Sequence, residues 1–429
     1  MKLGTRNARC FIACVVMTVL ALGSLTVGAA APSITVWMKK QFVESSNTAF
    51  VERAKEFSKA NGIDVKVELI AYEEFYPKWM AAIESKRLPD VSFFGYQEVG
   101  QFYGKGILRD ISGLYRDLNA KSPLYGSLVE AVTFGGKQYA IPFWTEATVG
   151  YVRKDLLDAA GVKVPSTWDE FRTAAKAVTS PKDGIYGAGI GYGRANSDAE
   201  WLTRSTIWSF GGALFGKDSK SVTVNGDATK QALQFVADMF LKDQSTPPGS
   251  VNWDDSGNNK AYLAGQAAMV FNTGSILNVM RNERQDLLVK TVLIPIPAGP
   301  KGRFVAGICN TLGIFKDSKN PDLAEKFIAY MMEPAWYRTW IETSAPLTTP
   351  VYTELEKDAI WKDPYNKAFI DSVAGFRFLG YSGEYTPVAG EVYNSRIVND
   401  AMQRILVDKW SVDRAVAELE TRIKAVAGK

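Results

Sequence analysis

The first part of the chain alternates between strand-like and helix-like spacing of apolar side chains. Residues 34–37 form a short apolar run typical of a strand, and apolar positions then recur at helical spacing over residues 50–57. Asn61-Gly62 supplies a helix stop, and residues 63–69 alternate with period two. This β-α-β order predicts a parallel sheet covered by helices, with ligands bound beyond the carboxyl ends of the strands.

Similar units follow along the chain and extend the prediction to an α/β fold. Apolar runs typical of strands occur at residues 139–142, 149–152, 186–190 and 268–271, each followed by a helical stretch. Thr167-Trp168-Asp169-Glu170 has the spacing of a capping box and predicts a helix start there. The sequence contains no low-complexity linker and no short-period repeat.

Length and composition narrow the functional classes. A chain of 429 residues with 46% hydrophobic residues predicts two or three domains with ample core. Lys and Arg number 50 against 46 Asp and Glu, so no large basic field is expected to attract nucleic acid. Histidine is absent, which removes Ser-His and Cys-His catalysis and His-liganded zinc. We therefore expect neither a cofactor nor a metal site.

The N-terminus predicts export. Three basic residues precede an uncharged run over residues 11–27, which ends in the small residues 28–31. This is the pattern of a cleaved secretory signal peptide, here assigned to residues 1–30, and it indicates a periplasmic protein. Cleavage leaves Cys309 as the one cysteine of the mature chain, so no intramolecular disulfide is expected.

Aromatic residues are plentiful, with 11 Trp, 18 Tyr and 22 Phe. A sugar receptor needs aromatic platforms for stacking and planar polar side chains for paired hydrogen bonds. Trp37, Tyr96, Trp144 and Trp201 have polar neighbours near the ends of expected strands. These residues favour a carbohydrate ligand.

Short motifs occur in a fixed order along the whole mature chain. They are Leu88-Pro89-Asp90-Val91, Tyr139-Ala140-Ile141-Pro142, Tyr151-Val152-Arg153-Lys154-Asp155, Pro165-Ser166-Thr167-Trp168-Asp169-Glu170-Phe171, Gly211-Gly212, Gly265-Gln266-Ala267-Ala268-Met269, Gly299-Pro300 and Ser318-Lys319-Asn320-Pro321. In this order and spacing the chain resembles the extracellular solute-binding proteins, family 1, of carbohydrate ABC importers, which are maltose-binding-protein-like.

The resemblance implies the periplasmic binding protein fold, with two discontinuous α/β lobes, hinge crossings and an interlobe ligand cleft. The expected crossings lie near residues 144–148, 269–274 and 315–320. The expected boundaries are 31–143 plus 275–316 for the N-terminal lobe and 144–274 plus 317–429 for the C-terminal lobe.

The resemblance also implies which residues contact the ligand, at the loops after strands and at the crossings. They are Trp37, Lys39, Tyr96, Gln97, Glu98, Trp144, Glu146, Trp201, Asn272, Gly274, Ser275, Asn310 and Arg377. Tyr381 and Tyr385 are further candidates beside Arg377. Ile276 stands where many relatives have a tryptophan, so one expected stacking platform is absent.

The function implied by the resemblance is capture of a sugar or small oligosaccharide by cleft closure. The monomeric, non-enzymatic protein would deliver this ligand to an inner-membrane ABC permease served by a cytoplasmic ATPase. One alternative is a binding protein for a polyol or a sugar or glycerol phosphate, for which Lys39, Lys40 and Arg194 are candidate contacts. The other alternative is a periplasmic glycoside hydrolase, which needs a pair of carboxylates across a cleft.

Overall fold

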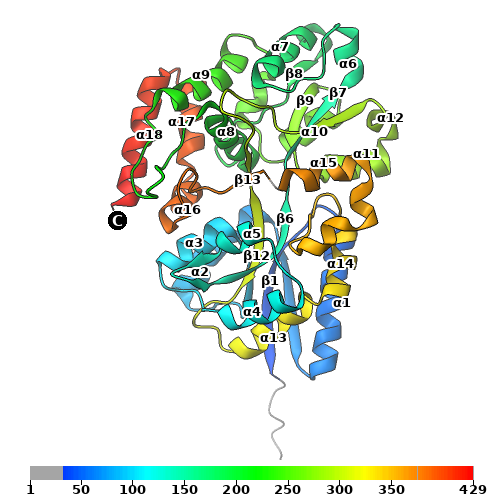
Figure 1. Cartoon of the computed structure of the whole chain (residues 1–429), viewed down its shortest axis with the longest axis vertical. Coiled ribbons are helices and arrows are strands. Elements are labelled where there is room, and N and C mark those ends of the chain that lie inside the picture. Colours follow the sequence, from blue (N-terminus) through cyan, green and yellow to red (C-terminus); the bar gives the residue numbers. More distant parts are fainter. Residues whose placement is uncertain (1–31, 374, 429) are drawn as a thin grey trace, which may run out of the picture.

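A computed structural model describes residues 32–373 and 375–428 of the chain. The expected signal peptide, residues 1–30, lies outside the described residues. Figure 1 shows two lobes, one above the other, each built around its own sheet. The α/β fold class with two discontinuous lobes is confirmed.

The first lobe contains a five-stranded sheet in the order β2-β1-β3-β12-β6. Its strands are β1 (Ser33–Lys39), β2 (Asp64–Ile70), β3 (Val91–Gly95), β6 (Ala140–Glu146) and β12 (Ile308–Gly313). β1 and β2 run parallel, and the helix between them ends at Gly62, whose φ of 62° suits glycine. The predicted β-α-β opening is therefore confirmed.

Helices cover both faces of this sheet (Figure 1). They are α1 (Glu44–Asn61), α2 (Tyr72–Ser85), α3 (Tyr96–Gly104), α4 (Ser112–Lys121), α5 (Gly126–Glu130), α13 (Pro321–Met331) and α14 (Pro334–Glu342), with the hairpin β4 (Thr133–Phe134) and β5 (Lys137–Gln138) beside them. Trp79 of α2 is one anchor of the core, because it is almost fully buried among several phenylalanines. Burying such a side chain stabilises the fold by about 1.5–3 kcal/mol.

The second lobe contains a four-stranded sheet in the order β10-β7-β9-β8. Its strands are β7 (Val149–Arg153), β8 (Tyr186–Ala188), β9 (Ala267–Asn272) and β10 (Thr291–Ile294). The helices are α6 (Lys154–Ala159), α7 (Trp168–Val178), α8 (Ser197–Phe210), α9 (Asp227–Leu241), α10 (Gly257–Leu263), α11 (Ser275–Glu283), α12 (Gln285–Leu288), α15 (Pro364–Val373), α16 (Pro387–Asn394), α17 (Ile397–Leu406) and α18 (Val412–Ala427).

The sheets are mixed, although the sequence predicts parallel ones. β12 runs antiparallel to both β3 and β6, and β7 runs antiparallel to β9. The reason is the connectivity: β6 leaves the first lobe toward the second, whereas β12 enters the first lobe from it. Strands that carry the chain in opposite directions across the hinge pair antiparallel.

Of the three crossings between the lobes, only the first lies where the sequence predicts it. β6 ends at Glu146 in the first sheet and β7 begins at Val149 in the second, within the expected range 144–148. The boundary at 275 is wrong, because β10 pairs with β7 and therefore keeps residues 275–294 in the second lobe. The second crossing follows β11 (Val305–Ala306), which pairs with β13 (Phe376–Arg377) between the lobes.

The third crossing also lies later than expected. α13 and α14 both pack on α1, so residues 317–342 belong to the first lobe and the expected boundary at 317 is wrong. The chain returns to the second lobe only after the short helix Thr353–Lys357, since α15 packs on β7 and β10. The physical reason is that α13 buries Phe327 and Ile328 against the first core.

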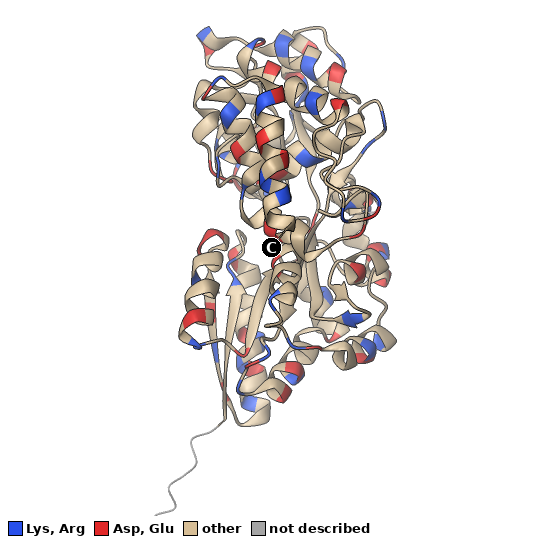
Figure 2. Ribbon diagram, turned by 90° about the vertical axis from the view of Figure 1, so that its left-hand side faces the viewer, with Lys and Arg blue, Asp and Glu red and all other residues tan. Residues whose placement is uncertain are grey.

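Surface charge is mixed. Figure 2 shows Lys and Arg interspersed with Asp and Glu over both lobes.

Within residues 32–373 and 375–428, no helix has both the length and the apolar character needed to cross a membrane.

The capping box at α7 gives a test of the local prediction. The Thr167 hydroxyl accepts from the Glu170 amide, and the Glu170 carboxylate accepts from the Thr167 amide. We expect Thr167→Ala to lower the free energy of unfolding by about 1 kcal/mol, measured by urea denaturation, because the first turn loses its cap. Thr173→Ala, on the exposed side of the same helix, is the matched control and should change stability by less than about 0.5 kcal/mol. Equal effects would contradict the capping role.

Candidate functional site

Side chains from three strands of the first lobe donate hydrogen bonds to the Glu146 carboxylate. Its Oε1 accepts from Lys39 Nζ at 2.8 Å, from Trp144 Nε1 at 3.1 Å and from Asn310 Nδ2 at 3.1 Å. These donors come from β1, β6 and β12, whose ends meet at the edge of the sheet nearest the second lobe. The buried carboxylate is thus compensated by one cation and two neutral donors.

A second polar group lies where β9 ends in the second lobe. Asn272 Nδ2 is 3.2 Å from Asp198 Oδ2 and 3.1 Å from Asn258 Oδ1. Ser275 Oγ donates to Asn272 Oδ1 at 3.1 Å and accepts from Asn259 Nδ2 at 3.0 Å. The amides therefore fix one another and hold the Asp198 carboxylate in place.

Asp198 lies beside another half-buried carboxylate, Asp255. Asp255 accepts from the backbone amides of Ser197 and Asp198, at the N-terminus of α8. Burial raises the pKa of both carboxyls, and the Asp255 charge raises the pKa of Asp198 further. The Asp255 side chain therefore caps the N-terminus of α8.

A third group joins the two lobes through Glu98, Glu200, Arg204, Tyr393 and Arg396. Glu98 comes from α3 of the first lobe, whereas the others come from α8, α16 and the start of α17. Arg204 donates to Glu200 Oε1 at 2.6 and 3.1 Å, with both side chains fully buried. The pKa of Glu98 is raised to about 8 by burial, although the Arg396 guanidinium opposes this shift.

Several polar atoms of this third group have no hydrogen-bond partner among the described residues. They are Glu98 Oε2, Glu200 Oε2, Arg204 Nη1 and Arg396 Nη1. A buried polar group without a partner costs about 1–3 kcal/mol. Arg396 also has a positive φ of 56°, which is uncommon for a residue with a side chain. A group with this cost and this strain indicates a functional site.

Tyr72 connects these groups. Its ring lies 5.3 Å from Lys39 Nζ, and its hydroxyl accepts from Gln97 Nε2 at 2.8 Å. Glu98, Tyr393 and Arg396 all influence its pKa, which burial raises well above the ordinary value. Tyr72 therefore links the first group to the third. The second group joins them through Asp198, which faces Glu146 and Lys39, and through Asp255, which faces Arg396. The three groups together form one polar cluster between the lobes.

The aromatic residues expected to stack on a sugar are covered by protein. Lys78 lies over the Trp37 ring at 4.7 Å, and Trp144 stacks on Phe93 at 5.5 Å. Trp201 stacks on Tyr393 at 4.7 Å and lies 6.4 Å from Tyr96, which is itself fully buried. All four side chains are buried in this arrangement of the lobes, and their contact with a sugar stays a prediction.

Of the two remaining residues expected to contact the ligand, one lies next to the polar cluster and the other lies away from it. Gly274 begins α11 beside Asn272, next to the polar cluster. Arg377 lies in β13, donates to the carbonyl of Phe376 at 2.8 Å and packs over Phe304 and Tyr381 at 5.8 and 5.7 Å. No contact between Arg377 and the polar cluster occurs within the described chain. Arg377 is therefore placed away from the cluster, and Arg396 supplies the guanidinium instead.

Sequence reasoning missed Tyr72, Asp198, Asp255, Tyr393 and Arg396. Asn196-Ser197-Asp198 has the composition of a helix N-terminus, which could have indicated the position of Asp198. The others carry no local signal. The candidates for phosphate binding also differ from expectation, because Lys40 is exposed and Arg194 is paired with Asp400.

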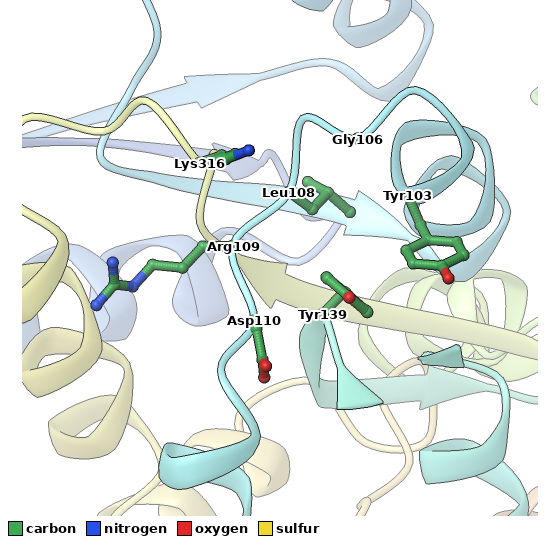
Figure 3. A pocket seen from close by; sticks show the side chains of 7 residues that line it. All are labelled: Tyr103, Gly106, Leu108, Arg109, Asp110, Tyr139 and Lys316. Carbon is green, nitrogen blue, oxygen red and sulfur yellow. The ribbon is translucent and has the colours of Figure 1, made fainter. Parts of the chain in front are cut away.

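A separate pocket of about 520 Å³ opens on the first lobe, lined by Tyr103, Gly106, Leu108, Arg109, Asp110, Tyr139 and Lys316. It adjoins the ends of β6 and β12 opposite to Glu146 and Ile308. Figure 3 shows the Arg109 side chain pointing away from the Tyr103 and Tyr139 rings. Two charged residues of this pocket already have partners, because Arg109 pairs with Glu325 and Asp110 pairs with Lys137. The interlobe cluster is the stronger candidate site.

The sequence and the structure both match known proteins. A family model described as "Bacterial extracellular solute-binding protein" matches residues 43–338. A Brucella abortus protein of the binding-protein class is 24% identical over 385 residues, covering 89% of this chain and 90% of that protein. The diacetylchitobiose binding protein of Streptomyces coelicolor is 24% identical, covering 70% and 69% of the two chains. An ABC transporter solute binding protein of Thermotoga lettingae, bound with α-D-tagatose, has a TM-score of 0.81 at 19% identity, covering 92% and 100%.

The raised pKa of Glu98 predicts a pH-dependent stability. Between its ordinary pKa of 4.5 and its raised pKa of about 8, the folded protein keeps a proton that the unfolded chain has lost. Stability therefore falls as pH rises through this window. Glu98→Gln cannot lose a proton, so we expect its Tm to exceed that of the unmodified protein at pH 8.5, by a margin that shrinks toward pH 5.

The control for this prediction is Glu84→Gln, which changes an exposed glutamate of α2. Its Tm should follow that of the unmodified protein at every pH. A pH-independent difference for Glu98→Gln would show that Glu98 is ionised in the folded state near neutral pH. Arg396, Tyr72, Tyr385 and Tyr393 face Glu98 and are present in both proteins, so their titration cancels in the comparison.

Proposed function

This chain belongs to the bacterial extracellular solute-binding proteins, and from that premise we propose that it captures a sugar or a related polyhydroxylated solute between its lobes and delivers it to an ABC permease. Membership identifies a binding protein and not an enzyme, so the glycoside hydrolase alternative is set aside. The family is extracellular, which makes the chain a secreted or periplasmic protein. A cleaved signal peptide and a periplasmic location remain part of the proposal.

One observation carries the proposal: both lobes contribute polar atoms to one cluster, and several of these atoms have no partner in the described protein. A ligand with many hydroxyl groups can donate to Glu98 and Glu200 and accept from Arg204 and Arg396. Hydroxyls are suited to this mixture because each both donates and accepts. Such a ligand would contact both lobes only when they are closed, so binding would shift the hinge equilibrium toward closure.

The charges in the cluster favour an uncharged ligand. Lys39 is paired with Glu146 and Arg204 with Glu200, while Arg396 faces Glu98, Glu200 and Asp255, so each of these three cations already has a carboxyl partner. A phosphate would have to displace such a partner, which disfavours binding. We therefore rank a neutral sugar or polyol above a sugar phosphate or glycerol phosphate.

Relatives support the carbohydrate class and the transport role. The Streptomyces coelicolor relative is named for binding diacetylchitobiose, and the Thermotoga lettingae neighbour holds a monosaccharide. We propose that this chain acts as a monomer, docks on an inner-membrane permease and releases its ligand for import driven by a cytoplasmic ATPase. No nucleic-acid partner is proposed.

Thermal unfolding against a ligand panel tests the function directly. Protein refolded to remove any bound solute would be melted with neutral sugars, polyols, sugar phosphates and glycerol phosphate. A ligand that binds only the native state raises Tm by mass action, about 2.7 kcal/mol of stabilisation at 100 times Kd. We expect a shift with a neutral compound, recovered chemically intact, and none with the phosphates.

The Asp198→Ala variant is the matched test of the site. Asp198 is half-buried in the cluster, so its removal should weaken binding at least tenfold, whereas Asp169→Ala on the exposed start of α7 should leave affinity unchanged. A shift with phosphates alone would contradict the charge argument. Chemical conversion of any sugar would contradict the binding function.

Small-angle scattering tests closure. We expect the radius of gyration of the ligand-free protein to decrease when the ligand found above is added, because the lobes rotate together around the hinge. A radius of gyration that is the same with and without saturating ligand would rule out closure as the capture mechanism.

A further inference from the structure

The lobes meet through α3 of the first lobe and α16 of the second, which Figure 1 shows one above the other. The two backbones touch, because a Cβ atom on Gly390 would lie 2.3 Å from the Gln97 carbonyl oxygen. The Tyr385 hydroxyl donates to the same carbonyl oxygen at 3.0 Å, and Asn394 Nδ2 donates to Gln101 Oε1 at 2.9 Å. Because α16 belongs to the second lobe, these contacts require the lobes to be closed. We call them the α3–α16 seam.

The Glu98 carboxyl lies beside this seam on α3 and is only 2% exposed. Tyr385, Tyr393 and Arg396 face it from the second lobe, and Tyr72 of α2 faces it from the first. The strands β3 and β12 also pack on α3, and neither contains a charged residue. Much of the cover over Glu98 therefore comes from the second lobe, so opening the lobes returns this carboxyl to water.

The burial of Glu98 is only partly compensated by charge. The cation that faces it is Arg396, which also faces Glu200 and Asp255, although Glu200 has Arg204 as a partner of its own. A guanidinium shared among several carboxyls does not offset the cost of removing each of them from water. Hydrogen bonds at the start of α3 favour the ionised form of Glu98, but burial outweighs them and raises its pKa to about 8.

We infer that closing the lobes takes up one proton on Glu98, so that the closed form is favoured as the pH falls. With the lobes open, Glu98 is hydrated and ionised at neutral pH. When the α3–α16 seam forms over it, the carboxylate accepts a proton from the solvent, and no other bond changes. This coupling concerns the closure of the lobes and is independent of which solute they capture.

The pH window follows from the pKa of Glu98 in the two forms. In the open form this pKa is near its ordinary value of 4.5, and in the closed form it is about 8. Below the window both forms carry the proton and above it neither does, so closure depends on pH only inside the window. There the closed form holds one proton more, and the equilibrium constant for closure falls by at most about tenfold for each unit of rising pH.

Small-angle scattering of refolded protein without any solute tests this with the proton as the only ligand. We expect the radius of gyration to increase from about pH 5.5 to about pH 8.5, because the ratio of closed to open molecules falls at least tenfold. In Glu98→Gln the side chain is neutral at every pH, so most of this increase should be absent. Glu84→Gln, on the exposed side of α2, is the matched control and should behave like the unmodified protein.

Circular dichroism at each pH would show that all three proteins are folded. A radius of gyration that is constant with pH in the unmodified protein would overturn the inference. An equal increase in the unmodified protein and in Glu98→Gln would overturn it as well, because another group would then control closure.

Calorimetry supplies a readout that a merely structural role of Glu98 would not move. The compound that raises Tm in the panel of sugars and polyols would be titrated near pH 6.5 in phosphate and in Tris, whose heats of ionisation differ. We expect the difference in binding heat to correspond to an uptake of about one proton by the unmodified protein and almost none by Glu98→Gln. Equal uptake in both proteins would overturn the inference. If no compound binds, the proposed function fails, whereas the scattering experiment still decides whether closure takes up a proton.

Discussion

A single buried carboxylate oxygen, Glu146 Oε1, determines how the first lobe ends at the hinge. Lys39, Trp144 and Asn310 reach it from three strands that are distant in sequence. An ionised carboxylate in this position is stable only if it is paired, and each charge-assisted hydrogen bond contributes about 1.5–3 kcal/mol. The requirement fixes the relative positions of β1, β6 and β12, and thereby the edge from which the chain crosses into the second lobe.

The second lobe satisfies its polar groups differently. Around Asn272 the amides and the serine satisfy one another, whereas around Glu200 and Arg396 several atoms are left without partners in the described chain. A hydrogen-bond network in which every group is paired, as around Asn272, holds its side chains rigidly. The atoms without partners around Arg396 are free to bind a ligand. The raised pKa values of Glu98, Asp198 and Glu200 reflect the same burial.

Aromatic residues illustrate why composition alone misleads. Their abundance does not by itself indicate a carbohydrate ligand, because Trp79, Trp144, Trp208 and Trp340 are nearly fully buried in cores. A tryptophan gains more from burial among apolar neighbours than from exposure beside a polar ligand, unless the backbone holds its face open. Close contacts at Gly390 and Gly274 bring backbones together between the lobes.

The sequence by itself determined the local elements, the first crossing and the family, because apolar periodicity, caps and ordered motifs are properties of neighbouring residues. It also identified Lys39, Gln97, Glu98, Glu146, Asn272, Ser275 and Asn310, all of which the structure places in the polar cluster. Only the tertiary structure decided the later crossings, since membership of β10 in the second sheet depends on pairing with the distant β7. It alone brought Arg396 to Glu98, which precedes it by 298 positions, and turned Arg377 away. The physical reason is that the direction of a side chain across an interface depends on packing between segments that are distant in sequence.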